Sequence, residues 1–277
     1  MTDASTAGSP SPPPPPPPRS MGAPEAPQDR PWWGPIDVLL AIPFVLVCGI
    51  AGVLIATMVS SIAGHDLGDD LDLPAYGLFI AVLGQQIGQG VWPVIVTRWK
   101  GLGLASDWGF VTDLGLNKMR IPRDIAWGLG IAVLCLIGAT VATEGMAALV
   151  GLSDPAEASN TSIISDNEGS PWLIGVIALV VVGAPLTEEL LFRGLILQAF
   201  KKSFGPAIAV VGSTLLFTLP HIQADATWRE SAVLLAAIAA IGLILAGAAL
   251  RIGRLGPTII AHLLFNAFGT AVALSSG

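Results

Sequence analysis

The sequence predicts an all-α fold, a polytopic transmembrane bundle of about seven helices that follows a disordered, proline-rich N-terminal tail. The first supporting observation is composition, because the 277 residues are 53% hydrophobic and 12% charged, whereas soluble domains carry about 25% charged residues. The second is a series of apolar runs, each about as long as a bilayer core is thick. The third is the alternation of basic loops with acidic or neutral ones. Together these features indicate a membrane protein.

The first 30 residues differ in composition from the rest of the chain. They contain an uninterrupted proline run, Pro12 to Pro18, which favours polyproline II and cannot join a packed core. They contain no apolar stretch of the kind that a signal peptide requires. Residues 1–30 are therefore predicted to be a disordered tail.

Seven apolar segments follow the tail. A helix needs about 20 residues to cross roughly 30 Å of hydrocarbon, and the fifth segment is the shortest. The predicted spans are 36–63, 75–97, 124–150, 171–200, 205–221, 229–250 and 256–275.

The loops predict the orientation in the cell membrane. Basic residues lie in the tail and around 98–123, 201–202 and 251–254, whereas the loops around 65–72 and 151–170 are acidic. The positive-inside rule then places the N-terminus in the cytoplasm and the C-terminus outside. Four Lys and nine Arg form no basic stripe, so nucleic acid is not expected as a partner.

The fourth segment carries a cluster of charges, Glu188, Glu189 and Arg193. Each charge at mid-bilayer costs about 2.5–3.5 kcal/mol on insertion scales, so such groups pair, face a cavity or act chemically. Glu189 and Arg193 are four residues apart on one face and are predicted to form an ion pair. Glu188 points about 100° away and is left free to act as a general base. Pro185 is expected to bend the helix and open backbone groups toward a cavity.

Two further pairs have helical spacing on later segments. Phe217 and His221 share one helical face in the fifth segment, and His262 and Asn266 share one in the seventh. Two of the three histidines in the chain thus lie in membrane segments. Together with the glutamates, they predict a polar site inside the membrane.

Glu, His, His and Asn permit two chemistries, both of which end in amide hydrolysis. In the first, Glu188 and His221 hold and deprotonate a water, while His262 and Asn266 donate hydrogen bonds to the oxyanion. In the second, Glu188, His221 and His262 bind a zinc ion that activates the water. The His-Glu-x-x-His pair typical of zinc proteases is not present in the sequence. The residues leave both chemistries open, one that needs no cofactor and one that uses zinc.

The three motifs Glu188-Glu189-x-x-x-Arg193, Phe217-x-x-x-His221 and His262-x-x-x-Asn266 resemble, in order and placement, those of the CPBP family. These are intramembrane proteases named for CAAX-protein and bacteriocin processing, also called ABI. The resemblance spans about residues 125–275. It predicts a catalytic membrane domain over 124–277, preceded over 31–123 by N-terminal transmembrane helices and a cytoplasmic loop.

The resemblance also implies an activity and roles. It implies an endopeptidase in which Glu188 and His221 act on the water, and in which His262 and Asn266 stabilise the transition state. It favours a glutamate-type mechanism, supported by Glu189, Arg193 and Phe217. The substrate is expected to be a membrane-associated peptide or protein, with peptide maturation or bacteriocin immunity favoured over prenyl-protein processing. The rival hypotheses are a non-enzymatic membrane scaffold or immunity protein, and a proton-coupled transporter.

Two expectations remain open at this point. Gln85 and Gln89 share a face of the second segment with Gln86 beside them, and we expect interhelical hydrogen bonds, with cavity lining as the alternative. At about 1.5 Å per residue, Glu188 lies roughly 18 Å, and His262 roughly 10 Å, from the cytoplasmic ends of their segments. His221 would lie near 25 Å, too deep for a compact site unless its helix tilts or begins after a re-entrant turn.

Overall fold

The computed structural model describes residues 33–68, 72–100, 113–116, 119–158, 164, 167–223 and 226–276. The chain divides into two units, Met1–Arg30 and Pro31–Gly277, and all of the described residues belong to the second. The tail over 1–30, with its proline run, lies outside the described residues. The boundary between 123 and 124 stays a prediction.

All regular secondary structure in the described ranges is helical, which confirms the predicted fold class. Six helices are long and apolar enough to cross a membrane, and Pro206–His221 is a shorter apolar helix. Most predicted spans agree with the observed helices to within three residues at either end. The long helices are α1 (Pro35–Ile62), α2 (Ala75–Lys100), α4 (Ile121–Val150), α10 (Trp228–Ile252) and α11 (Gly256–Ser276).

The fourth span is one continuous but irregular helix. It consists of α6 (Leu173–Ala178), a π-helical segment (Leu179–Gly183), α7 (Ala184–Glu188), a second π-helical segment (Glu189–Ile196) and α8 (Leu197–Phe204). π-Helical turns are rare and occur often at functional sites, because they free backbone carbonyls and re-aim side chains. The Glu188–Arg193 cluster lies at the start of the second π-helical segment.

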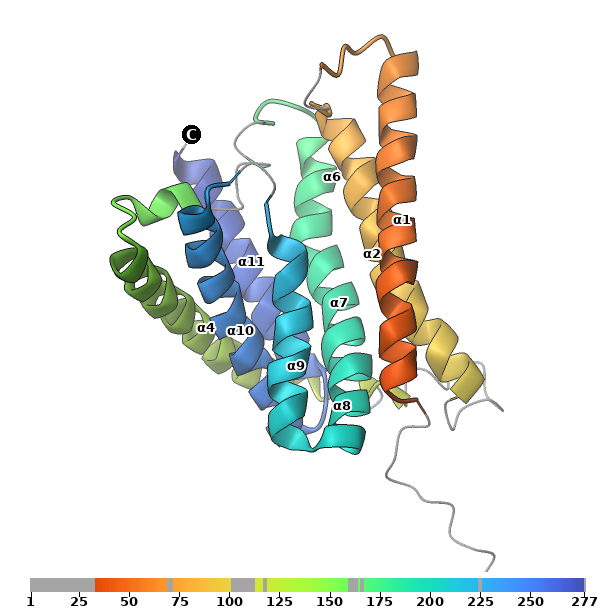
Figure 1. Ribbon diagram of the computed structural model, residues 1–277, viewed down its shortest axis with the longest axis vertical. Coiled ribbons are helices and arrows are strands. Elements are labelled where there is room, and N and C mark those ends of the chain that lie inside the picture. The colour runs from red at the N-terminus through yellow and green to blue at the C-terminus, as the bar shows by residue number, and fades with distance from the viewer. Residues whose placement is uncertain are drawn as a thin grey trace, which may run out of the picture. The chain divides into compact units, whose positions relative to one another are not determined.

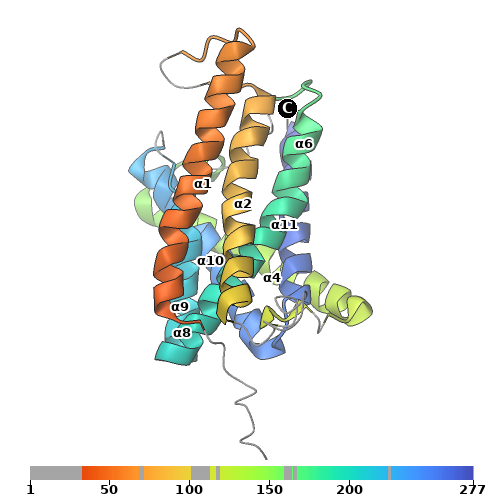
Figure 2. The same ribbon diagram turned by 90° about the vertical axis from the view of Figure 1, so that its right-hand side faces the viewer.

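α1 and α2 form an antiparallel hairpin along one side of the membrane unit (Figures 1 and 2). Glycines allow the two backbones to approach closely. A Cβ at Gly84 would lie 2.6 Å from the Cα of Gly52, and one at Gly88 would lie 2.9 Å from the Cβ of Cys48. Small residues four apart drive helix association in membranes, where burial of apolar surface gives no net gain.

The remaining helices pack on the other side of the fourth span (Figure 1). α9 (Pro206–Thr218) turns back along α8 at Gly205, whose φ of +85° favours glycine. α9 also packs against α10, and α4 covers α10 and α11. A short 3₁₀ turn, Leu219–His221, ends the α9 helix.

The expectation that His221 lies too deep is wrong. The fourth helix continues to Phe204 instead of ending near 200, and α9 runs antiparallel to it. Gly205, at the turn, follows Glu188 by seventeen residues and precedes His221 by sixteen. The two side chains are therefore at similar heights, and no re-entrant turn is needed.

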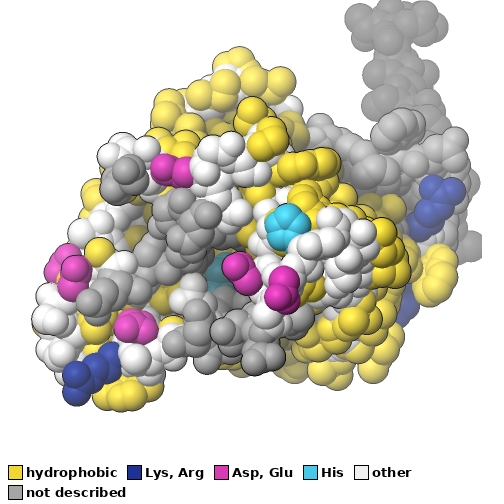
Figure 3. Space-filling model, turned by 90° about the horizontal axis from the view of Figure 1, so that it is seen from above, with side chains coloured by type: hydrophobic (Ala, Val, Ile, Leu, Met, Phe, Trp, Pro, Cys, Tyr) yellow, Lys and Arg dark blue, Asp and Glu magenta, His cyan; other side chains and the backbone are white. Residues whose placement is uncertain are grey.

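Most basic residues gather at one end of the bundle, with Arg229 at the other end, where α10 begins. The end formed by the last turns of α2, α8 and α10 and the first turns of α4 and α11 is basic (Figure 1). The opposite end, seen from above in Figure 3, displays Asp and Glu side chains. The residues of the basic end are Arg98, Lys100, Arg120, Arg123, Lys201, Lys202, Arg251 and Arg254. Those of the acidic end include Asp66, Asp72, Asp154, Glu168 and Glu230.

Candidate active site

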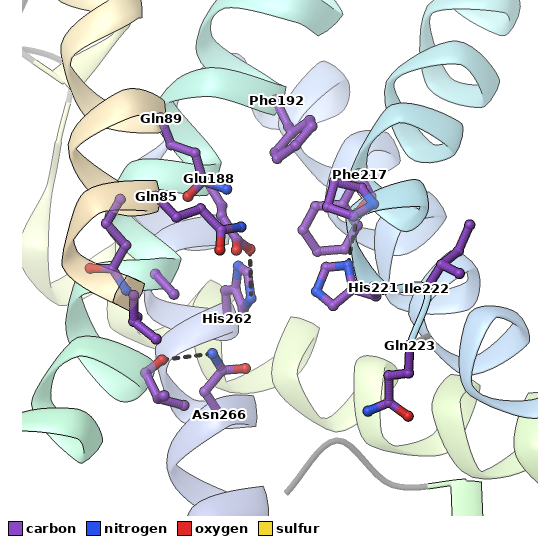
Figure 4. Close-up of a pocket in the computed structure, with 15 residues that line it drawn as sticks. Gln85, Gln89, Glu188, Phe192, Phe217, His221, Ile222, Gln223, His262 and Asn266 are labelled. Atoms are coloured by element: carbon purple, nitrogen blue, oxygen red, sulfur yellow. Dashed lines mark hydrogen bonds and ion pairs between the residues drawn. The ribbon is translucent and has the colours of Figure 1, made fainter. Parts of the chain in front are cut away.

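A polar cavity of about 400 Å³ lies among α2, the fourth span, the end of α9 and α11. The four residues predicted to be catalytic, Glu188, His221, His262 and Asn266, all line it, as does Phe217 (Figure 4). Three separate helices supply these side chains, so the fold brings together what the sequence keeps up to 78 residues apart. Figure 4 shows Glu188, His262 and Asn266 on one wall and His221 on the opposite wall.

The Glu189–Arg193 ion pair expected from the spacing is present beneath the cavity floor. Nη1 of Arg193 lies 2.9 Å from Oε1 of Glu189, and both side chains are almost fully buried. The guanidinium also donates to the carbonyl of Gly242 at 3.4 Å and stacks over the ring of Phe217, with Cζ 4.3 Å from its centroid. A buried pair of this kind tolerates the loss of neither partner.

The same carboxylate holds His262, a contact that helical spacing alone does not predict. Nδ1 of His262 lies 3.2 Å from Oε1 of Glu189. Because a carboxylate accepts, Nδ1 is the donor. The other ring nitrogen, Nε2, therefore faces the cavity, where it lies 3.7 Å from Oε2 of Glu188. Arg193, Glu189, His262 and Glu188 thus form one chain of charged and polar contacts that leads from the core to the cavity.

Glu188 is the carboxylate of this chain that reaches the cavity. Its side chain is 12% exposed, whereas that of Glu189 is fully buried. Its distance of 3.7 Å from Nε2 of His262 is longer than a hydrogen bond. A water that lies beside these two atoms in the cavity can contact both of them.

Asn266 is held by a backbone carbonyl of the fourth helix that has no partner within that helix. In a π-helix the carbonyl of residue i accepts from the N–H of residue i+5, as Leu179 does from Ala184. Val180 would accept from residue 185, but Pro185 has no N–H. Its carbonyl instead accepts from Nδ2 of Asn266 at 2.9 Å (Figure 4). The bend expected at Pro185 is realised as a freed carbonyl that orients a cavity side chain.

His221 is oriented in a similar way at the end of α9. Nδ1 of His221 lies 3.0 Å from the carbonyl of Phe217, which the 3₁₀ turn leaves without its α-helical partner. Since a carbonyl can only accept, Nδ1 donates and Nε2 remains available. The ring of Phe217 lies 5.5 Å from that of His221 and 5.9 Å from that of His262. Phe217 therefore packs between both histidines and Arg193.

The glutamines of α2 fulfil both expectations raised for them. Nε2 of Gln86 donates to the carbonyl of Leu179 at 2.9 Å, and Oε1 of Gln89 accepts from Thr187 at 3.2 Å. These interhelical bonds connect α2 to the irregular helix. Gln85, Gln86 and Gln89 also line the cavity. The spacing of Gln85 and Gln89, four residues apart on one helical face, was the signal for this wall.

The zinc alternative requires Glu188, His221 and His262 to converge on one point. Within the described ranges, no group of three or more His, Cys, Asp or Glu side chains is arranged to hold a metal ion. Nδ1 of each histidine is engaged, with Phe217 and Glu189 respectively, and the two Nε2 atoms belong to opposite walls (Figure 4). The arrangement does not fit a zinc site, and no step below passes through a metal.

Comparison with known proteins identifies one family. Residues 170–268 match the family model described as type II CAAX prenyl endopeptidase Rce1-like. The matched segment contains all three motifs and agrees with the resemblance seen in the sequence. Neither the curated proteins nor the solved structures gave a significant match.

Proposed function

We propose that the chain is an intramembrane endopeptidase, because residues 170–268 match the Rce1-like CAAX protease family model and the described helices are those of a multi-pass membrane protein. The substrate is a membrane-associated peptide or protein, and a water activated by Glu188 hydrolyses its peptide bond. The observation that supports this most is the approach of Glu188 to Nε2 of His262, at 3.7 Å on one wall of a polar cavity inside an apolar bundle.

The separation of these two groups suits peptide hydrolysis. When water attacks a carbonyl carbon, the attacking oxygen and the carbonyl oxygen become bonded to the same atom. A general base for the first oxygen and a donor for the second must then be neighbours. Glu188 is the base, and Nε2 of His262 is the donor.

The proposed reaction proceeds in two steps. Glu188 takes a proton from the water as its oxygen bonds to the carbonyl carbon, and Nε2 of His221 accepts the other hydrogen of that water in a hydrogen bond. The carbonyl oxygen becomes an oxyanion that receives hydrogen bonds from Nε2 of His262 and the second N–H of Asn266. The C–N bond then breaks, and Glu188 returns its proton to the departing amine.

The supporting residues fix the geometry of the donors. Glu189 orients His262, and Arg193 pairs with Glu189 in the core. The carbonyl of Val180 orients Asn266. Such preorganised donors are worth about 3–4 kcal/mol each in comparable oxyanion holes.

We also propose that the N-terminus is cytoplasmic and the C-terminus outside. The grouping of eight basic residues at the end from which α1 starts supports this orientation. Asp37 and Asp124 at the same end are paired with Lys100 and Arg254, both at 2.6 Å.

Comparative analysis of membrane peptides tests the proposed function. Cells that carry Glu188→Gln should accumulate at least one uncleaved precursor that wild-type cells process. Glu144→Gln, which alters an exposed glutamate of α4 outside the cavity, should not. Identical peptide profiles in all three strains would leave the scaffold or transporter hypothesis in place. Stoichiometric zinc in elemental analysis of the purified protein would overturn the metal-free mechanism.

A further inference from the structure

A second cavity, of about 700 Å³ and almost wholly apolar, adjoins the catalytic one. α1, α2, α9 and the second π-helical segment line it. The two cavities share Gln85 and Gln89 as lining residues, together with three apolar ones. A chain that extends from one cavity into the other therefore passes these two glutamines, both of which lie outside the segment that matches the family model.

The side-chain amides of Gln85 and Gln89 differ in which of their atoms lack a hydrogen-bond partner. Gln89 is 3% exposed, and its Oε1 is occupied by Thr187, which leaves its Nε2 available. Gln85 forms no hydrogen bond with any of the residues that the structure describes. Figure 4 shows both side chains extending from α2 toward the side of the cavity where Glu188 lies. Gln85 is exposed and lines both cavities, so its whole amide is open to a ligand that enters them.

A peptide substrate supplies the missing partner. To be cleaved inside a membrane, a peptide must be extended at the bond that breaks, and its backbone N–H and C=O groups then have no water to bond. Glu188, His221, His262 and Asn266 are engaged with the reacting atoms. Gln86 is engaged with Leu179. On the α2 wall, the Gln85 amide, Nε2 of Gln89 and Oε1 of Gln86 have no hydrogen-bond partner among the described residues, and of these three glutamines Gln85 and Gln89 also line the apolar cavity.

We propose that Gln85, assisted by Gln89, binds the peptide backbone of the substrate beside the cleaved bond. This inference rests on the proposed function and adds the contact that holds the substrate. A primary amide carries two donor hydrogens and an acceptor oxygen, so the Gln85 amide can pair with both polar groups of one peptide unit. Gln85 is thus a substrate-binding residue, and its loss should change KM far more than kcat.

The test uses the full-length protein in proteoliposomes and a panel of internally quenched apolar peptides. Gln85→Met keeps the length of the side chain and removes its hydrogen bonds. It should raise KM roughly tenfold with kcat changed less than about twofold. Gln85→Glu, which retains the acceptor, should recover part of the loss. Ile87→Met, on the exposed side of α2 outside both cavities, is the matched control and should keep the wild-type KM.

Single N-methyl groups on the probe separate a direct contact from a structural effect. Methylating the peptide nitrogen that pairs with Gln85 should raise the KM of the wild type roughly tenfold. The KM of Gln85→Met should not change. An equal penalty in both proteins at every position, or an unchanged KM in Gln85→Met, would overturn the inference.

A binding arm separates this inference from the proposed function. In a Glu188→Gln background, fluorescence anisotropy of the same probes should show roughly tenfold weaker binding when Gln85→Met is added. If this difference is found while the wild type cleaves no probe, peptide binding by Gln85 is supported and the proposed peptidase activity is contradicted. If the wild type cleaves probes but the difference is missing, the peptidase stands and the role of Gln85 is wrong.

Discussion

Glu189 and His262 lie 73 residues apart in the sequence and 3.2 Å apart in the structure, where the buried carboxylate accepts from Nδ1 of the imidazole. Arg193 contacts the same carboxylate oxygen at 2.9 Å. One carboxylate therefore both neutralises a buried cation and orients a ring whose other nitrogen faces the cavity. The ion pair of the fourth helix is connected to the candidate chemistry through this contact.

Removing each partner of this pair should separate stability from activity. Glu189→Leu leaves Arg193 buried and unpaired, and should lower the free energy of unfolding by about 3–5 kcal/mol. The double variant Glu189→Leu/Arg193→Leu removes both charges and should recover most of that loss. It should still lose about 10²-fold or more in peptide cleavage, because His262 has no orienting carboxylate. Thermal unfolding in detergent and cleavage assays measure the two effects.

A double variant that is as active as the wild type would show that Glu189 only balances charge. A double variant no more stable than Glu189→Leu would show that the loss comes from packing instead of from the unpaired cation.

Pro185→Ala tests the freed carbonyl. Alanine restores an N–H that can reach the carbonyl of Val180, and this N–H then competes with Nδ2 of Asn266. Peptide cleavage should fall about tenfold through kcat, while the free energy of unfolding changes by less than about 1 kcal/mol. Asn266→Leu should lower kcat at least as much. Wild-type kcat in Pro185→Ala would mean that the position of Asn266 does not depend on the π-helical turn.

The sequence predicts the helices well because each one must satisfy its own backbone hydrogen bonds across about 30 Å of hydrocarbon. Charge patterns on helices likewise predict the Glu189–Arg193 pair. The structure gathers the four predicted site residues into one cavity, and their catalytic roles stay a prediction. The depth of His221 relative to Glu188 was not predictable from the sequence, because it depends on where the fourth helix ends. That helix ends at Phe204 and not near residue 200.

Contacts between helices could not be predicted from the sequence either. Regular helical spacing predicts which residues share a face, but π-helical segments change those faces locally. The pairing of Val180 with Asn266 needs both the missing N–H of Pro185 and the approach of α11, and neither follows from periodicity. The same holds for Gln86 and Gln89, whose partners lie on a helix that only the tertiary fold brings near.

Thiol labelling tests the proposed orientation. In a background in which Cys48 and Cys135 are replaced by alanine, a membrane-impermeant maleimide should label Asp154→Cys in intact cells. It should label Lys201→Cys only after the membrane is permeabilised, because the basic end is expected in the cytoplasm. The reverse pattern would invert the topology while leaving the cavity unchanged.

The most direct measurement of the central claim is the turnover of a cleaved peptide by purified Glu188→Gln protein in proteoliposomes, with Glu144→Gln as the matched control. Loss of a general base should lower kcat by about 10²–10⁴-fold. The unfolding temperature should stay near the wild-type value, because the Glu188 side chain reaches the cavity and lies 3.7 Å from His262, beyond hydrogen-bonding distance. Full turnover in a folded Glu188→Gln protein would contradict a glutamate-activated water at this site.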